Sequence, residues 1–293
     1  MAQQIPVDDE ALFGFPVPEE AVRAVAPDLA YRRLAMVNVV FAGEPDGPWV
    51  LIDAGLPGMA GMIRHSADAR FGAHRPPAAI ILTHGHIDHV GALRTLAERW
   101  NVPIYAHPQE HPYLNGTSAY PKPDARVGGG MMSLVASLFP RGPLDVGTWL
   151  RALPEDGSVP AMPGWRWIHT PGHSVGHVSL WREADRTLIA GDAFITTAQE
   201  SAYAVALQEP ELHGPPMYFT ADFEKAAESV RDLAALDPEV VVCGHGHAMR
   251  GPAMRAGLQQ LALDFERVAV PAKGLYVDRP ARVEDGTAYP GRT

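Results

Sequence analysis

The sequence has little cysteine, no long apolar run and no leader-like start. Its 293 residues include one cysteine, Cys243, so no disulfide can form within the chain. This fits a reducing compartment. The first ten residues show neither the basic segment nor the apolar core of a secretory signal. The apolar stretch at residues 34–42 is too short to span a bilayer. These absences predict a cytoplasmic protein with no membrane partner.

Basic residues are also in the minority. The chain carries 24 lysines and arginines against 34 aspartates and glutamates, for a formal net charge of −10. Nucleic-acid-binding proteins normally present a basic patch or stripe, and the sequence contains no dense run of lysine or arginine. We therefore expect no nucleic-acid partner and a small-molecule ligand instead. With 46% hydrophobic residues, the composition is that of a globular protein with a sizeable core.

Four metal-ligating side chains stand together in residues 83–89, Thr-His-Gly-His-Ile-Asp-His, directly after an apolar run. They are His84, His86, Asp88 and His89. Imidazole and carboxylate are both ligands of zinc and similar divalent ions. Residues two apart in an extended segment point the same way, so His84, His86 and Asp88 can share one side. His89 joins them if the chain turns after Asp88. The motif predicts the floor of a metal site at a strand end.

Apolar segments alternate with helical patterns along the chain, which is typical of a layered α/β protein. The pattern predicts strands at residues 31–42, 48–52, 78–82, 102–106, 165–169, 178–181, 187–190 and 240–243. It predicts helices at residues 59–69, 91–100, 223–236 and 253–268. We interpret residues 1–293 as a single domain.

Three segments lie outside this pattern. Residues 1–29 are an arm that covers the surface or helps to form a homodimer contact, with a partly ordered tail as the alternative. Residues 108–150 are divided by proline and glycine around one short apolar piece. This insertion is either a lid over a pocket or a helix packed on the core. Residues 271–293 are a Pro/Gly-rich tail that serves as surface cover.

Further candidate ligands stand at the ends of other predicted strands: Asp53, His173, Asp192 and His245. Active sites of layered α/β proteins gather at strand ends, where loops are free to carry function. Without Asp53, the chain offers five histidines and two aspartates. This is too many for one tetrahedral ion and suits two ions.

This set resembles the metallo-β-lactamase-fold hydrolase superfamily. The matching elements are His84-x-His86-x-Asp88-His89, His173 in Pro-Gly-His-Ser, Asp192 after glycine and His245 between glycines, with Asp53 upstream. The resemblance implies a four-layer αββα sandwich with two divalent metal ions at one edge. Zinc is the first candidate, and iron and manganese are alternatives. The implied first site is His84, His86 and His173. The implied second site is Asp88, His89 and His245, and Asp192 bridges both.

The resemblance also implies supporting roles. Asp53 would lie behind the ligands and orient them by hydrogen bonds, with a capping or turn carboxylate as the alternative. His177 and His247 are assigned to similar supporting positions. Asp88 or Asp192 would orient the nucleophile, a hydroxide between the two ions that attacks an ester, thioester, lactone or amide of a small molecule.

The substrate is left open. The motif contains Asp88, and in this respect the chain resembles the glyoxalase II and lactonase branches of the superfamily. Glyoxalase II relatives carry a C-terminal helical domain for glutathione, whereas 48 residues (293 − 245) follow His245 here. Lactonases place a tyrosine three residues after the bridging aspartate, where this chain has Ile195. Expected substrate contacts in the irregular stretches and beside the bridging aspartate are Met131, Met132, Phe139, Phe194, Tyr203 and Tyr218.

Two other functions fit the same motif. A mononuclear iron persulfide dioxygenase would use only His84, His173 and Asp192. A metal-binding protein with no catalytic role is the other alternative, although every ligand position is retained.

Overall fold

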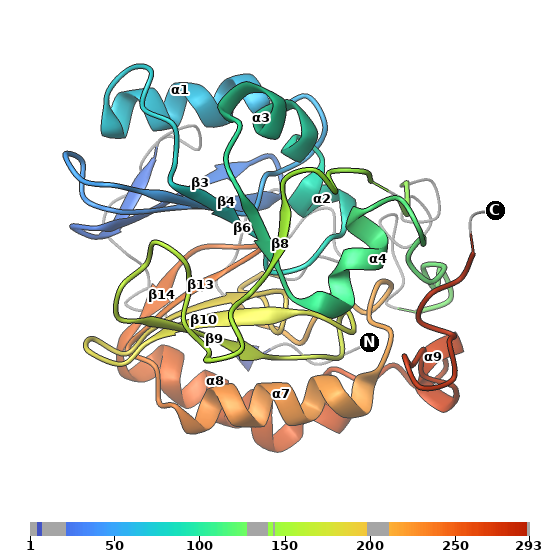
Figure 1. Cartoon of the computed structure of the whole chain (residues 1–293). Coiled ribbons are helices and arrows are strands. Elements are labelled where there is room, and N and C mark those ends of the chain that lie inside the picture. Colours follow the sequence, from blue (N-terminus) through green and yellow to red (C-terminus); the bar gives the residue numbers. More distant parts are fainter. Residues whose placement is uncertain (1–4, 8–21, 128–139, 143, 198–210, 292–293) are drawn as a thin grey trace.

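The structure is a computed structural model that describes residues 5–7, 22–127, 140–142, 144–197 and 211–291. It has four layers (Figure 1). Helices α1 (Ala60–Phe71) and α3 (Leu93–Trp100) cover one sheet, and α7 (Phe223–Ala235) and α8 (Gly251–Val268) cover the other. The two sheets face each other in the middle, as expected for an αββα sandwich.

The first sheet has seven strands in the order β2-β3-β4-β5-β6-β7-β8. They are β2 (Arg23–Ala26), β3 (Leu29–Leu34), β4 (Val37–Ala42), β5 (Val50–Ile52), β6 (Ala79–Ile81), β7 (Ile104–Ala106) and β8 (Leu150–Ala152). Pairing is antiparallel from β2 to β5 and parallel from β5 to β8. Parallel neighbours require a crossover, which α1 supplies between β5 and β6, and α3 between β6 and β7.

The second sheet has five strands in the order β14-β13-β11-β10-β9. They are β9 (Trp165–His169), β10 (Val178–Arg182), β11 (Thr187–Gly191), β13 (Val240–Cys243) and β14 (Met249–Arg250). Strands β11 and β13 run parallel and are joined by α7. The remaining short elements are β1 (Ile5–Pro6), which pairs with β12 (Glu211–Leu212), and α2 (Ile87–Val90), the 3-10 helix η2 (Pro108–Glu110), α4 (His111–Leu114) and α9 (Leu275–Asp278).

Hydrophobic side chains fill each gap between layers. One cluster joins α1 and α3 to the first sheet, a second lies between the sheets, and a third joins α7 and α8 to the second sheet. Strands in the middle of such a stack are buried on both faces, so they are apolar without alternation. Helix α7 begins where Asp222 accepts a hydrogen bond from Lys225 N at 3.1 Å. A cap of this kind stabilises a helix by about 1 kcal/mol.

The predicted helices and most predicted strands are confirmed, but one strand is wrong. Residues 31–42 form the hairpin β3–β4 instead of a single strand. The turn lies at Ala35, whose φ of 55° places it in the left-handed region. The prediction missed it because alanine and methionine are not typical turn residues, unlike glycine, proline and asparagine.

The segments outside the sandwich differ in what the structure shows. The predicted arm contributes β2 and the first residue of β3 to the first sheet. The apolar piece of the insertion, residues 131–139, lies outside the described residues. The tail packs against the described part of the insertion: Tyr276 Oη donates to Lys122 O at 2.8 Å, and Tyr113 Oη donates to Ala288 O at 2.7 Å. Within the described ranges, no helix is both long and apolar enough to cross a membrane.

Candidate metal centre

The candidate ligands meet where strand ends from both sheets lie together. His84 and His86 follow β6 in the first sheet. His173, Asp192 and His245 follow β9, β11 and β13 in the second sheet. All seven candidate ligands are buried, and Asp88 is the most exposed of them at 9%. The fold therefore brings together residues that are up to 161 positions apart (245 − 84).

The extended geometry predicted for the motif is wrong after His86. His86 is extended, with φ −63° and ψ 152°, but α2 begins at Ile87. Asp88 therefore comes from a helical turn together with His89, and the chain turns before Asp88 instead of after it. The motif is divided into two pairs, which reach different neighbours.

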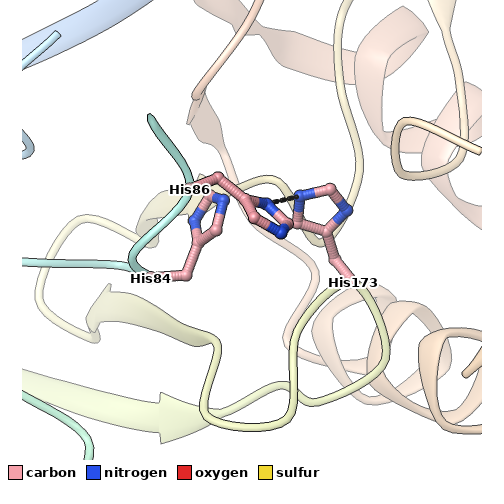
Figure 2. Close-up of side chains that lie close together, drawn as sticks. All are labelled: His84, His86 and His173. Carbon is pink, nitrogen blue, oxygen red and sulfur yellow. Dashed lines mark hydrogen bonds between the residues drawn. The ribbon is translucent and has the colours of Figure 1, made fainter. Parts of the chain in front are cut away.

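In the part of the chain that the structure describes, three groups have ligand atoms that all lie within 4.8 Å of one another. The groups are His84/His86/His173, His84/His89/Asp192 and Asp88/His89/His245. The first and third are the two sites that the family resemblance implies. Figure 2 shows the first group, in which His86 Nδ1 and His173 Nε2 are 2.9 Å apart.

Asp192 lies between the two sites. Its Oδ2 is 3.5 Å from His173 Nε2, 3.5 Å from His89 Nε2 and 3.2 Å from His245 Nε2. The backbone behind it has no room for a side chain, since a Cβ at Gly244 would lie 2.1 Å from Asp192 Oδ1. One carboxylate oxygen therefore contacts ligands of both groups, as a bridging ligand requires.

The donor set fits divalent metal ions. Among the described residues, the buried atoms His84 Nε2, His89 Nε2 and Asp192 Oδ1 have no hydrogen-bond partner. A buried polar atom left unsatisfied costs about 1–3 kcal/mol, so three at one place indicate that something else binds there. Histidine nitrogen and carboxylate oxygen are the ligands that zinc takes in proteins.

Polar groups behind the ligands fix their orientation. Asp53 Oδ2 accepts from His89 Nδ1 at 2.8 Å, and Asp53 also accepts from Thr83 N at 2.8 Å and Thr83 Oγ1 at 2.7 Å. His245 Nδ1 donates to Met36 O at 2.6 Å. In both histidines Nδ1 carries a proton, and Nε2 is the atom that faces Asp192. Asp53 therefore has the orienting contact expected of it.

The two histidines assigned to supporting positions differ. His177 Nε2 accepts from Asp192 N at 2.9 Å, and its Nδ1 lies 2.8 Å from Thr170 Oγ1. It therefore holds the backbone of the bridging residue. His247 Nδ1 instead accepts from Arg23 Nη1 at 2.9 Å, a contact that joins the loop after β13 to β2.

The histidine pKa values differ between the two ligand groups. Burial and the neighbouring imidazoles lower the pKa of His84 and His173, and burial lowers the pKa of His86 to about 4. Burial also opposes a charge on His245, but Asp192 and Asp88 raise its pKa to about 10. The first group is therefore neutral without metal, whereas Asp192 and Asp88 keep a proton on the imidazole of His245 in the second group. Metal binding there releases protons.

A small cavity adjoins the first group. Its walls include His86, His173, Tyr120, Phe219 and Tyr276. Its volume of about 10 Å³ is enough for one water molecule. No local pattern in the sequence indicated these aromatic residues, because they come from different parts of the chain.

Two of the six predicted substrate contacts lie within the described residues, and both are away from this cavity. Phe194 is fully buried in the cluster beneath α7 and α8, and Tyr218 is 1% exposed in a cluster with Val127 and Phe223. Neither lines the cavity. The other four predictions, Met131, Met132, Phe139 and Tyr203, fall outside the described residues.

Comparison with known proteins agrees with this geometry. Residues 32–245 match the metallo-beta-lactamase superfamily. The chain belongs to this superfamily. It is 49% identical over 231 residues to the probable metallo-hydrolase YflN of Bacillus subtilis, covering 78% of this chain and 87% of that one. The probable metallo-hydrolase YybB of the same organism is 34% identical over 170 residues, covering 58% and 64%.

Solved structures share the fold of this superfamily member. The Rm3 metallo-beta-lactamase matches with a TM-score of 0.58 and 20% identity, covering 84% of this chain and 93% of that one. The family protein TTHA1429 from Thermus thermophilus matches with a TM-score of 0.55 and 19% identity, covering 83% and 81%. At these identities the likeness establishes the architecture alone.

Proposed function

We propose that this protein is a metal-dependent hydrolase that uses two divalent metal ions to cleave an ester, thioester, lactone or amide of a small molecule. The observation that carries the proposal is the position of Asp192, whose carboxylate contacts histidines of two separate ligand groups. The names of the two Bacillus relatives, both probable metallo-hydrolases, support it.

Each of the two ligand groups would hold one metal ion. His84, His86 and His173 would hold one ion, and the second group would hold the other. When bound, two such ions would lower the pKa of a water ligand toward neutrality and polarise the substrate carbonyl. Zinc is the first candidate because the donors are imidazole and carboxylate, and iron and manganese accept the same donors.

The chain itself supplies position and proton control. Asp192 and Asp88 lie beside the histidines of the second group and would orient the attacking water through their free lone pairs. Asp53 keeps the proton of His89 on Nδ1, so that Nε2 stays available as a ligand. Burial of all these groups strengthens their electrostatic effect on the reacting atoms.

Ile195, three positions after Asp192, reduces the number of substrate classes that fit the proposed site. Ile195, which stands where lactonases have tyrosine, cannot donate a proton to a leaving group, and it pairs with His213 in a β-bridge. Substrates whose leaving groups depart as stable anions, such as thiolates or phenolates, need no such acid. We therefore favour thioesters and aryl esters within the proposed class.

The test combines metal analysis with activity. Protein purified without chelator is analysed for metal content, reloaded with zinc, iron or manganese, and assayed against thioesters, aryl esters, lactones and β-lactams. We expect two ions per chain, and for Asp192→Asn a loss of about 100-fold or more in kcat/KM, the scale of removing one electrostatic group from an active site. Asp232→Asn, an exposed position on α7, is the matched control.

Two results would overturn the proposal. One is hydrolysis at the parent rate by folded Asp192→Asn. The other is one iron per chain together with oxygen consumption on a persulfide, which would assign a dioxygenase reaction to His84, His173 and Asp192.

A further inference from the structure

A buried glutamate lies behind the first ligand group. Glu110 is 0% exposed and is the last residue of η2, directly after β7. The seven candidate ligands follow other strands, so Glu110 reaches the centre from a separate strand end. Its four hydrogen-bond donors are all uncharged.

Each carboxylate oxygen of Glu110 binds a different ligand loop. Oε1 accepts from Ser174 Oγ and from Gly176 N, both at 2.8 Å. Oε2 accepts from Gly85 N at 3.0 Å and from Tyr120 Oη. Gly85 separates His84 from His86, and Ser174 follows His173 in the sequence. The carboxylate therefore connects the two loops that together form the first group.

Two glycines permit this contact. A Cβ at Gly176 would lie 2.8 Å from both Cγ and N of Glu110. A Cβ at Gly85 would lie 2.8 Å from Tyr120 Oη. Real Cβ atoms do not approach other atoms so closely. Both loops have a glycine at the point where they approach the Glu110 network.

We propose that Glu110 is a positioning residue that sets the separation of the His84–His86 loop from the His173 loop, and thereby the geometry of the first metal site. This inference rests on the proposed metal centre. A backbone hydrogen bond from Val178 N to Thr83 O, at 2.9 Å, also joins the two segments. It lies outside both ligand loops, whereas Glu110 binds the loops themselves.

The role requires a carboxylate and not merely a polar side chain. A glutamine has one acceptor oxygen and one NH₂ group. Whichever way the amide is turned, its NH₂ faces a backbone N–H of one loop, either Gly85 or Gly176. If it faces Gly176, that N–H loses its acceptor while buried, which costs about 1–3 kcal/mol. If it faces Gly85, that N–H loses its bond to residue 110 and keeps Tyr120 Oη as its acceptor at 2.8 Å. Glu110→Gln therefore releases one loop while it preserves the size of the side chain.

The experiment measures metal binding directly, without a substrate. Zinc affinity at each site is determined by chelator competition, and cobalt(II) loaded into the first site reports its geometry through visible absorption. We expect Glu110→Gln to bind the first ion about 10–100-fold more weakly, the usual effect of removing a partner behind the ligands. We expect its cobalt spectrum to change while the second site keeps its affinity. Glu228→Gln, on the exposed face of α7, is the charge-matched control.

Ser174→Ala is the second variant, because it removes one donor and leaves Gly176 N on the same oxygen. We expect about 2- to 10-fold weaker binding at the first site, the equivalent of one hydrogen bond. It decides the question if Glu110→Gln does not fold.

An unchanged cobalt spectrum and unchanged affinity in folded Glu110→Gln would overturn the role of Glu110. Equal weakening at both sites would also overturn it, because it would reflect a general loss of structure. Neither readout depends on hydrolysis, so a parent protein that binds two ions but cleaves no substrate contradicts the proposed function alone.

Discussion

Asp53 shows how a single residue behind the metal centre is held in an unfavourable conformation. Its φ of 60° lies in the left-handed region, which costs a residue with a side chain about 1–2 kcal/mol. Three hydrogen bonds to Thr83 and His89 offset this cost. The strain places the carboxylate directly behind a ligand.

We predict that Asp53→Asn weakens metal binding at the second site by about 10–100-fold. The amide can accept with one oxygen only, so it cannot serve both Thr83 and His89. Chelator competition at each site is the measurement, and Asp46→Asn in the exposed β4–β5 turn is the control. An equal loss at the first site would show that Asp53 supports the fold in general and not His89 in particular.

At the scale of residues, the sequence predicted which side chains meet at the candidate centre where they are close together in the chain or in a recognised order. His84 to His89 are six consecutive positions, and the downstream ligands follow apolar strands. Glu110 gave no such signal. Its partners Gly85 and Gly176 are 25 and 66 residues away, and nothing in its Pro-rich surroundings distinguishes it from a surface glutamate.

At the scale of elements, the start of β4 holds the loop after β13. Asn38 is 2% exposed, and its Nδ2 donates to Cys243 O at 2.9 Å and to Gly246 O at 2.7 Å. Its backbone N donates to Gly244 O at 2.7 Å. These bonds connect the first sheet to the loop of the second sheet that carries His245.

We predict that Asn38→Ala lowers the free energy of unfolding of the metal-free protein by about 1–3 kcal/mol. Two buried carbonyl oxygens lose their donor, and nothing replaces it. Urea unfolding followed by circular dichroism gives the value. Thr117→Ala also removes two side-chain hydrogen bonds, but at an exposed site, and is expected to change stability little. A similar loss in both variants would contradict the account.

The hairpin β3–β4 shows what the sequence pattern could not predict about the secondary structure, namely the turn between two adjacent strands. Period and composition located the strands, because their residues are apolar. Pairing between β3 and β4 over six residue pairs imposes the turn at Ala35. The sequence has no typical turn-forming residue at this point. The same holds for α2, whose four residues begin a helix in the middle of the ligand motif.

For the whole molecule, the alternation of strands and helices predicted the layers, but it did not predict which residues join them. His107 and His177, which belong to neither ligand group, are also held without charge in the folded chain. Burial and the neighbouring His169 and His111 lower the pKa of His107 to about 4, and burial lowers the pKa of His177 to about 3. In the unfolded chain both titrate near 6.5.

We predict that the metal-free protein loses stability as the pH falls from about 6.5 to about 4. In this window the unfolded chain binds more protons at these histidines than the folded chain, so the free energy of unfolding rises with pH. Urea midpoints at pH 7 and pH 5 measure the effect.

His107→Asn tests one contribution to this loss. His107 Nδ1 accepts from Gln109 N at the start of η2, and asparagine retains such a cap without titrating. We expect a smaller difference between the two midpoints in the variant. If the parent and the variant lose the same stability, His107 does not contribute.

The candidate ligands come from both sheets, and this affects how readily the protein is degraded in a cell. Ions held by the two ligand groups would join the end of β6 to the ends of β9, β11 and β13, and would act as cross-links at one edge of the sandwich. A ligand that binds only the folded state stabilises it in proportion to the logarithm of its concentration. Chains made under metal starvation are therefore expected to open more often at this edge and to be cleaved there by proteases, so that metal supply would set how much of the protein survives.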